Sequence, residues 1–364
     1  MSRILFLAIH FITLHSFRKE MIQAMVSAGH EVWLSLPEDP DNEFFEKMGC
    51  NIVTTEISRR GLNPVKDLRL MFSYRSIIRK VQPDIIFSFT IKPNIYGTLA
   101  SNGRGVRHVC NITGTGATFL NPGLVATICI NLYRLSVKRC YKTFFQNTGD
   151  RNFFVQHGMV KAERSEMLPG SGCNLEQHAF KPLSPTEHLN FIYIGRVMKL
   201  KGIDEYLACA KAIHERHPNT TFYIAGWNEE PEYMAKVEEA QKGGYVEYLG
   251  FRKDIDQWIE RCHCTILASH GGEGVPNVLL ESAATGRICI ASNINGSRDV
   301  IDDGITGYLF EMGNASDLAA KVERFISLTD EEKSAMGLAG RKKVEREFDR
   351  NIVVGKYLKE IESL

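Results

Sequence analysis

Short apolar runs alternate with amphipathic segments along the first half of the chain. Residues 3–9 form an apolar run suited to a buried parallel strand, and residues 17–28 repeat apolar side chains at helical spacing. Further strand-like runs follow at residues 31–36 and 84–89, the second after a helical segment that ends at a proline. This strand–helix–strand succession predicts a doubly wound α/β sheet.

The same succession starts again in the second half. Residues 189–195 indicate a first strand and residues 203–216 a helix. The chain finishes in a long charged helix, about residues 330–364, which we expect to break near residues 337–340 and 348–349. Further strands are expected at residues 221–226, 246–249, 264–268 and 288–292.

A chain of 364 residues is long enough for two domains of ordinary size. We expect an α/β protein with a first domain over residues 1–168 and a second over residues 169–345. Residues 346–364 are expected to form a helix that packs back on the first domain. Two separate Rossmann-like domains are therefore the predicted architecture.

The composition is that of a soluble globular protein, with 44% apolar and 24% charged residues. Disordered, collagen-like and coiled-coil classes are thereby excluded. The first residues lack the pattern of a signal peptide, and no run of 18 apolar residues is present, so a cytoplasmic protein without a membrane span is expected. The nine cysteines include no CxxC pair, and we expect free thiols, no metal and no cofactor.

Charge is unevenly distributed, although the net charge is only +1. Residues 1–165 hold 21 Lys and Arg against 12 Asp and Glu, whereas the rest holds 23 against 31. Residues 59–142 hold 14 basic side chains and two acidic ones. A basic half indicates an anionic surface or ligand, with chance or attraction between the two halves as the alternative.

Several common nucleotide motifs are absent. A nicotinamide-dependent dehydrogenase has GxGxxG directly after its first strand, but residues 8–13 contain no glycine. Residues 114–116 supply only half of that fingerprint. The sequence also lacks a Walker A loop, HExxH and GxSxG, so a dinucleotide oxidoreductase and a phosphate-loop ATPase are weak interpretations.

Two cations flank the predicted loop after the first strand of the second domain. Gly195 and Arg196 end that strand, and Lys201 and Gly202 open the next helix. Cations at a strand end beside a helix N-terminus form a suitable cradle for a diphosphate. The alternative is a pair of solvated surface cations.

A second cluster contains two glutamates in a strand–loop–helix segment. Glu273 lies in a glycine-rich loop over residues 270–276, and Glu281 lies about two helical turns further along. Backbone N–H groups of such a loop can face a ligand, and the carboxylates can accept hydrogen bonds from vicinal hydroxyls of a sugar and a ribose. The alternative is one loop acid and one helix-surface acid without a ligand.

At these residues the chain resembles the retaining glycosyltransferases of family 4, which have the GT-B fold of two Rossmann-like domains facing across a cleft. Glu273 and Glu281 match the family's Glu-x7-Glu signature, and Asn174 stands where an aspartate is usual. The resemblance implies catalytic roles for Glu273, Arg196 and Lys201. It implies a donor-binding set that is made up of Gly170, Gly195, Arg196, Lys201, Arg252, Gly274, Val275, Asn277, Val278 and Glu281.

The first half resembles a narrower group, the transferases that extend lipid-diphosphate-linked glycans of bacterial surface polysaccharides and glycoproteins. The stretches that carry this resemblance are residues 58–64, 92–97 and 111–116. Two features depart from the group: residues 10–16 replace a Gly-Gly loop, and Asn111 and Thr113 stand where some members have a histidine. The acceptor-binding candidates are His10, His15, Arg59, His108 and Thr113.

The resemblance implies the transfer of a hexose or N-acetylhexosamine from a UDP-sugar to a polyprenyl-diphosphate-linked saccharide, with retention and without a metal. It also implies a peripheral position on the cytoplasmic face of the inner membrane. Arg134, Lys138 and Lys142 are spaced as one stripe on a helix, which could contact anionic lipid headgroups. A core helix with snorkelling cations is the alternative.

Two other functions remain open at the level of sequence. A sugar-nucleotide epimerase of the same fold would need no acceptor, and a non-catalytic sugar-nucleotide-binding scaffold would need no chemistry. Nucleic acid is not an expected partner, because the basic stretch has no interleaved aromatic platform.

Overall fold

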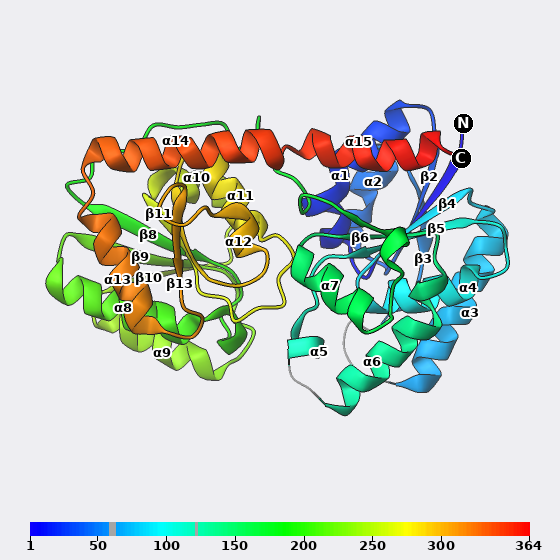
Figure 1. Ribbon diagram of the computed structural model, residues 1–364, viewed down its shortest axis with the longest axis horizontal. Coiled ribbons are helices and arrows are strands. Elements are labelled where there is room, and N and C mark those ends of the chain that lie inside the picture. Colours follow the sequence, from blue (N-terminus) through cyan, green and yellow to red (C-terminus); the bar gives the residue numbers. More distant parts are fainter. Residues whose placement is uncertain (58–62, 121–122) are drawn as a thin grey trace. The chain divides into compact units, whose positions relative to one another are not determined.

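The computed structural model describes residues 1–57, 63–120 and 123–364. The chain folds into two compact units (Figure 1). Met1–Ser171 and Asn351–Leu364 form the first unit, and Gly172–Arg350 form the second. The observed division lies a few residues after the expected boundaries at 168 and 345.

Seven parallel strands of the described residues form the sheet of the first unit, in the order β3-β2-β1-β4-β5-β6-β7. They are β1 (Arg3–Leu7), β2 (Glu31–Leu36), β3 (Asn51–Thr54), β4 (Ile85–Phe89), β5 (Arg107–Ile112), β6 (Lys142–Phe145) and β7 (Ser165–Met167). The helices are α1 (Phe11–Ser27), α2 (Glu43–Lys47), α3 (Pro64–Val81), α4 (Thr98–Ser101), α5 (Ala117–Leu120), α6 (Leu124–Leu135), α7 (Thr148–Gln156) and α15 (Arg350–Glu362), of which Arg350 itself lies in the second unit.

Six parallel strands form the sheet of the second unit, in the order β10-β9-β8-β11-β12-β13. They are β8 (Leu189–Ile194), β9 (Thr220–Ala225), β10 (Val246–Gly250), β11 (Cys264–Leu267), β12 (Ile288–Ser292) and β13 (Gly307–Phe310). The helices are α8 (Ile203–Arg216), α9 (Glu232–Lys242), α10 (Ile255–Arg261), α11 (Asn277–Ala284), α12 (Ser297–Val300), α13 (Ala315–Ile326) and α14 (Asp330–Glu347).

The first six strands of each sheet have the same order when each is counted from its own first strand, and the first sheet adds β7 at one edge. The direction of strand addition reverses beside that first strand, between β1 and β4 in one unit and between β8 and β11 in the other. Open parallel sheets bind ligands at such a switch point, outside the carboxyl ends of the strands. The doubly wound α/β architecture with two Rossmann-like units, predicted from the sequence, is confirmed.

Most predicted elements agree closely with the observed ones, but α1 begins earlier than its apolar pattern indicated. The predicted start was residue 17, whereas the helix begins at Phe11. His10 is its N-cap, and the side chain of His10 accepts a hydrogen bond from the Thr13 N–H at 3.2 Å. A capping side chain satisfies a backbone donor that the first turn leaves free, so the helix can extend toward β1.

The expected break near residues 337–340 is wrong, because α14 is continuous through both glycines. Gly337 and Gly340 are buried. A Cβ atom at Gly337 would lie 2.3 Å from the carbonyl oxygen of Gly286, so glycine here permits close packing of α14 rather than a bend. The break at residues 348–349 is confirmed, since α14 ends at Glu347 and α15 begins at Arg350.

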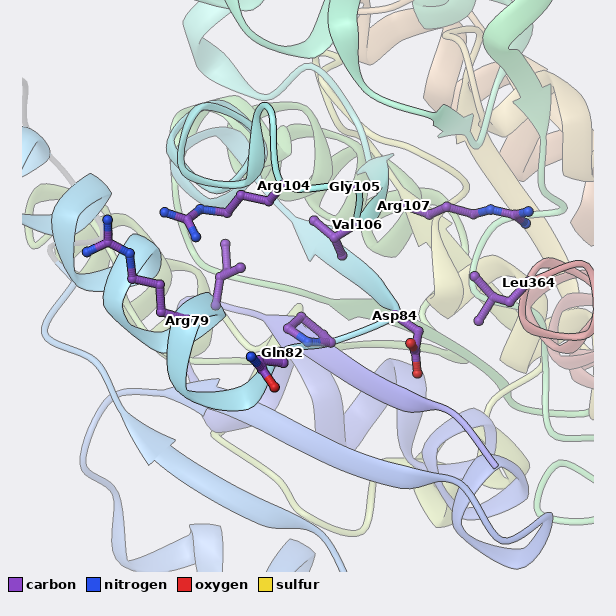
Figure 2. A pocket seen from close by; sticks show the side chains of 10 residues that line it. Arg79, Gln82, Asp84, Arg104, Gly105, Val106, Arg107 and Leu364 are labelled. Atoms are coloured by element: carbon purple, nitrogen blue, oxygen red, sulfur yellow. The ribbon is translucent and has the colours of Figure 1, made fainter.

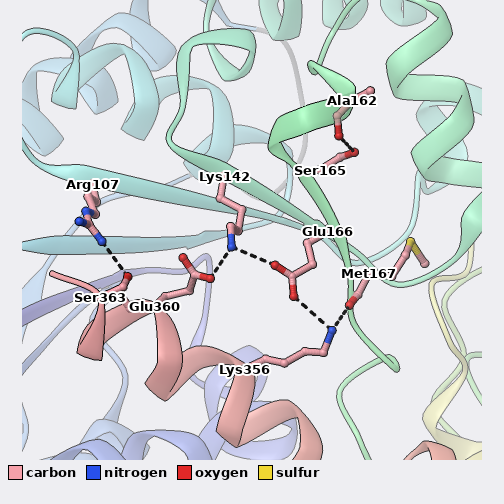
Figure 3. Close-up of polar contacts among 9 residues, drawn as sticks. All are labelled: Arg107, Lys142, Ala162, Ser165, Glu166, Met167, Lys356, Glu360 and Ser363. Atoms are coloured by element: carbon pink, nitrogen blue, oxygen red, sulfur yellow. Dashed lines mark hydrogen bonds and ion pairs between the residues drawn. The ribbon is translucent and has the colours of Figure 1, made fainter.

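Polar contacts attach α15 to the sheet of the first unit (Figure 3). Lys142 on β6 donates to Glu360 at 2.5 Å and to Glu166 at 2.9 Å, and Lys356 donates to Glu166 at 3.2 Å. The side chain of Tyr357 is buried between Phe87 and Phe144, with ring centroids 5.1 and 5.3 Å away. These contacts explain why residues 351–364 belong to the first unit.

The predicted helical stripe of Arg134, Lys138 and Lys142 is wrong. The helix α6 ends at Leu135, Lys138 lies in a separate 3₁₀ turn, and Lys142 is the first residue of β6. Lys142 is paired with two glutamates within the first unit rather than presented to a membrane. Pairing of β6 with β5 forces residues 142–145 into an extended conformation, which a helical spacing argument cannot anticipate.

Candidate functional site

Two oppositely charged side chains meet at the switch point of the second sheet. Lys201 follows β8 and Glu273 follows β11, and the Lys201 ammonium forms an ion pair with the Glu273 carboxylate. Ser269 donates a hydrogen bond of 2.9 Å to the same carboxylate oxygen. The structure thus brings together two of the three residues to which the sequence assigned catalysis.

Glycine allows the two loops to approach this closely. Gly202 has φ +71°, and a Cβ atom there would lie 1.9 Å from the carbonyl oxygen of Ala268 at the end of β11. Gly226 has φ +154°, and its Cβ atom would lie 1.8 Å from the carbonyl oxygen of Gly195. Only a residue without a side chain fits at either position, so these two glycines set the spacing of the loops after β8, β9 and β11.

Arg196 extends toward a different acid of the same sheet edge. Its guanidinium lies 3.5 Å from the carboxylate of Glu229, which follows β9. The hydroxyl of Tyr193 donates to the carbonyl oxygen of Arg196 at 2.7 Å and fixes the backbone there. Glu229 was not among the residues predicted from the sequence, because an acid in a polar loop carries no spacing signal that distinguishes it from a solvated one.

The remaining donor candidates line the loop before α11 and its first turns. Gly274 and Val275 precede the helix, Asn277 is its first residue, and Val278 and Glu281 follow on it. A Cβ atom at Gly296 would lie 1.7 Å from the carbonyl oxygen of Gly274. The loop containing Gly296 therefore packs directly on the glycine-rich loop and supports it.

Two polar side chains on α11, those of Asn277 and Glu281, are candidates for hydrogen bonds with a ligand. Within the described residues, the side-chain oxygen of Asn277 is shielded from solvent and has no hydrogen-bond partner. Buried acceptors are normally satisfied, so this atom is a candidate contact for a bound molecule. Burial raises the pKa of the Glu281 carboxyl above its ordinary value, while the positive charge of Arg350 opposes that rise.

Exposed aromatic rings lie at the same edge of this sheet, after β9 and β10. Trp227 is 41% exposed and Phe251 is 60% exposed, and their ring centroids are 5.7 Å apart. Arg252 forms two hydrogen bonds with the carboxylate of Asp254, at 2.8 and 2.6 Å. Two large exposed aromatic side chains in contact provide a surface on which a planar group can stack.

The acceptor candidates that the structure describes lie in different surroundings within the first unit. His10 caps α1 at the carboxyl end of β1, and Thr113 follows β5. His15 lies between Phe11 and Phe44, with ring centroids 4.9 and 4.7 Å away, and burial lowers its pKa. Arg59 lies outside the described residues, as does most of the 58–64 stretch.

His108 is not available for acceptor contact, contrary to the prediction. The side chain is buried, and its two ring nitrogens are 2.8 Å from Ser88 Oγ and 2.9 Å from Ser101 Oγ. Burial lowers its pKa to about 3. His108 therefore serves the core of the first unit as a neutral side chain. Gly170, a donor candidate, lies near the end of the first unit's main segment and has φ +63°.

Thr90 is a residue that the sequence analysis missed. It follows β4 at the switch point of the first sheet and has φ +73°, a strained value for a β-branched residue. Among the described side chains, its hydroxyl is one of the shielded groups without a hydrogen-bond partner. The π-helical turn Pro93–Gly97 begins three residues later. Strain and π turns occur preferentially at functional sites, but no sequence signal marks a single threonine.

Two family models match the chain, one in each half. Residues 175–343 match "Glycosyl transferases group 1", and residues 3–147 match "Glycosyl transferase 4-like". The two Rossmann-like units are therefore those of the GT-B fold of glycosyltransferases. The second half of the chain therefore matches the group 1 glycosyltransferases, and the first half matches the family 4-like model.

Curated relatives of similar length support this assignment. The chain is 26% identical, over 98% of its length and 97% of the relative's, to N,N'-diacetylbacillosaminyl-diphospho-undecaprenol alpha-1,3-N-acetylgalactosaminyltransferase of Campylobacter jejuni. It is 23% identical, over 75% of its length and 73% of the relative's, to UDP-Gal:alpha-D-GlcNAc-diphosphoundecaprenol alpha-1,3-galactosyltransferase of Escherichia coli. The chain is thus an enzyme, a glycosyltransferase.

Solved structures share the whole fold at low sequence identity. The crystal structure of Anabaena HepE in complex with UDP and glucose has a TM-score of 0.80 at 17% identity, with full coverage of both chains. A glycosyltransferase from Rickettsia africae has a TM-score of 0.83 at 18% identity, covering 100% of this chain and 98% of that one.

Proposed function

We propose that this protein transfers a hexose or N-acetylhexosamine from a UDP-sugar to a lipid-diphosphate-linked saccharide, with retention of configuration. The observation that carries the proposal is the Lys201–Glu273 ion pair at the switch point of the second sheet. The two curated relatives described above are named for transfer to undecaprenol-diphosphate-linked sugars, which supports the acceptor class. An epimerase or a non-catalytic scaffold is not favoured by relatives that are named as transferases.

The two cations of the site neutralise the departing nucleoside diphosphate. In the structure, Lys201 is paired with Glu273 and Arg196 is close to Glu229. A bound diphosphate offers these cations a stronger, more highly charged partner, to which they donate hydrogen bonds. Negative charge grows on the diphosphate as the glycosidic bond breaks, so preorganised cations stabilise the transition state more than the ground state. In this proposal the two side chains supply the positive charge that the reaction needs.

Glu273, the ion-pair partner of Lys201, binds the sugar in this proposal. When Lys201 turns to the diphosphate, the Glu273 carboxylate keeps the Ser269 hydrogen bond and accepts hydrogen bonds from sugar hydroxyls in place of the ion pair with Lys201. The unpaired side-chain oxygen of Asn277 supplies a further acceptor in the same loop–helix segment. Gly274 and Val275 border the sugar in the same loop, and Glu281 accepts hydrogen bonds from the ribose hydroxyls.

The nucleotide base is assigned to the far side of the same sheet edge. Trp227 and Phe251 present exposed rings after β9 and β10, and Arg252 is held by Asp254 beside them. Stacking on such rings is tolerant of base identity, and the assignment of uracil is supported by the Escherichia coli relative, which is named for a UDP-Gal donor.

Retention fits an attack from the face that the diphosphate leaves. The acceptor hydroxyl loses its proton to a departing phosphate oxygen while the new glycosidic bond forms, so no carboxylate nucleophile is required. Arg196 and Lys201 keep that phosphate in place during the exchange. The first unit holds the acceptor at its own switch point, where His10, Thr90 and Thr113 follow β1, β4 and β5.

Membrane contact is assigned to the helical face of the first unit that carries exposed apolar side chains. The helices α3 and α6 cover the same face of the first sheet (Figure 1). No helix in the described ranges is long and apolar enough to cross a membrane. We place this face on the anionic cytoplasmic surface of the inner membrane, and we assign no nucleic acid as partner. The exposed apolar residues are Val65, Leu68, Phe72, Leu124, Val125, Ile128 and Leu135.

The test is a transfer assay with purified protein, a panel of UDP-sugars and a synthetic undecaprenyl-diphosphate-linked saccharide. The expected product is an extended lipid-linked saccharide whose new anomeric configuration matches that of the donor. Conversion of the UDP-sugar without acceptor would instead establish an epimerase. A folded protein that binds UDP but gives no product with any donor would support the scaffold and overturn the proposal.

A further inference from the structure

A cavity of about 550 Å³ lies at the opposite edge of the first sheet from its switch point (Figure 2). Its wall includes the C-terminal end of α3, the residues just before β4, the turn after α4 and the first residue of β5, all at the amino ends of the strands. This position separates it from the acceptor site proposed above. The lining residues used below are Arg79, Asp84, Arg104 and Arg107.

Two of the three arginines of this cavity are available to a ligand. Figure 2 shows the guanidinium groups of Arg79 and Arg104 on one side, while Arg107 extends to the other. Arg107 donates to Ser363 at 2.8 Å and lies over the Tyr141 ring at 4.9 Å. Arg104 uses only its Nε, which donates to the carbonyl oxygen of Ala100.

Basic side chains outnumber acidic ones in the wall of this cavity. Asp84, the acid of the cavity wall, already accepts a hydrogen bond from the Arg3 N–H at 2.7 Å. In the part of the chain that the structure describes, no carboxylate pairs with Arg75, Arg79 or Arg104. Partial desolvation and the charges of Arg75 and Arg79 lower the pKa of Arg104. Unpaired cations around a concave surface attract an anion.

Helix dipole compensation accounts for only part of this charge. Arg79 and Lys80 lie in the last turn of α3, where cations stabilise the helix. Arg104 comes from a different segment, and Arg75 lies a turn earlier on α3. The helix dipole therefore does not explain why Arg104, from another segment, lies at the same cavity as Arg79.

The exposed face of α3 indicates the source of the anion. The α3 residues that are spaced to share one face of the helix are exposed and change from apolar to basic along its length. The apolar end can enter the acyl boundary of a bilayer while the basic end meets phosphates at its surface. In chain order these residues are Val65, Leu68, Phe72, Arg75 and Arg79.

We propose that Arg79 and Arg104 bind a phosphate group in this cavity, and that this phosphate belongs to an anionic lipid headgroup. Arginine donates two parallel hydrogen bonds to phosphate oxygens, which makes a pair of arginines a specific rather than a diffuse contact. The proposal deepens the membrane contact of the proposed function and rests on it, since it names the residues that orient the first unit on the bilayer.

The experiment compares a double variant, Arg79→Glu with Arg104→Glu, with Lys80→Glu as matched control. Lys80 lies in the same last turn of α3 but does not line the cavity. Co-sedimentation is measured with phosphatidylcholine vesicles that contain or lack phosphatidylglycerol. We expect the double variant to lose anionic-vesicle binding by about tenfold or more, and the control to lose several-fold less. The unfolding temperature of each variant is measured to separate loss of binding from loss of folding. If the glutamate variant is unstable, the double variant Arg79→Gln with Arg104→Gln, which removes both charges without adding negative ones, takes its place.

Two outcomes would overturn the proposal. Equal losses in Lys80→Glu and the double variant would show a diffuse basic surface without a site. Calorimetric binding of inorganic phosphate or glycerol phosphate that the double variant abolishes, with vesicle binding unchanged, would show a soluble phosphate ligand instead of a lipid. UDP binding is measured in parallel, so a failure of the donor site is distinguished from a failure of this cavity.

Discussion

Lys201 and Glu273 form an ion pair across 72 residues of sequence because the strands that precede them, β8 and β11, are neighbours in the second sheet. Both side chains are about one-fifth exposed, at 22% and 19%. Such a pair holds a cation and an acid in place at the site, and neither side chain is part of the buried core. It is the feature on which the donor-site predictions depend.

Lys201→Ala should reduce the transfer rate by roughly tenfold to a hundredfold or more, because a charge-assisted hydrogen bond to the diphosphate contributes about 1.5–3 kcal/mol. UDP binding should weaken as well. The measurement is steady-state transfer together with calorimetric titration of UDP. Lys199→Ala is the control, since Lys199 is an exposed lysine two positions earlier. Equal effects in both variants would contradict the role of Lys201.

Gly202→Ala should destabilise the second unit by more than the roughly 1–3 kcal/mol that left-handed backbone strain costs. The added Cβ atom would meet the Ala268 carbonyl oxygen at 1.9 Å, and moving this loop displaces Lys201. Urea unfolding and UDP affinity measure the two effects. Gly244→Ala is matched to it, with φ +79° and open space around the new atom. If both variants lose the same stability, close packing at Gly202 is not the cause.

Thr90→Gly should stabilise the first unit by roughly 1 kcal/mol and still impair transfer. Glycine relieves the strain at φ +73°, but it removes the unpaired hydroxyl at the switch point. We expect a raised KM for the lipid-linked acceptor with UDP affinity unchanged. Thr90→Ser keeps the hydroxyl and should preserve the acceptor KM. A normal acceptor KM in Thr90→Gly would assign this residue a purely structural role.

The buried, neutral His108 should make the protein less stable in acid. Its pKa is about 3 in the folded protein and near 6.5 when exposed, so the unfolded chain binds more protons between these values. Stability from this residue is fully present above about pH 6.5 and falls by up to about 1.4 kcal/mol per pH unit as the pH drops toward 3. Unfolding of His108→Gln should show a weaker pH dependence than the parent over that range. Parallel profiles would rule out this contribution.

Local pattern was sufficient for most of the fold. The helix Ile203–Arg216 and the strands Glu31–Leu36 and Ile288–Ser292 were predicted with their observed bounds. Each is long enough for its apolar periodicity to be read without knowledge of neighbours. The errors fall where a distant contact decides the local structure, as at Gly337, whose missing side chain permits close packing against Gly286 inside a continuous helix.

The donor-binding loops could also be predicted from the sequence, since cations, glycines and glutamates occur at characteristic spacings in residues 195–202 and 273–281. The sequence by itself determined two Rossmann-like units and these loops, because both depend on local order along the chain. Tertiary structure alone decided the ion pairs of Lys201 with Glu273 and of Lys142 with Glu360. It also decided the burial of His108 and the backbone strain at Thr90. Those outcomes depend on which strands become neighbours, and strand pairing joins residues whose separation in sequence carries no periodic signal.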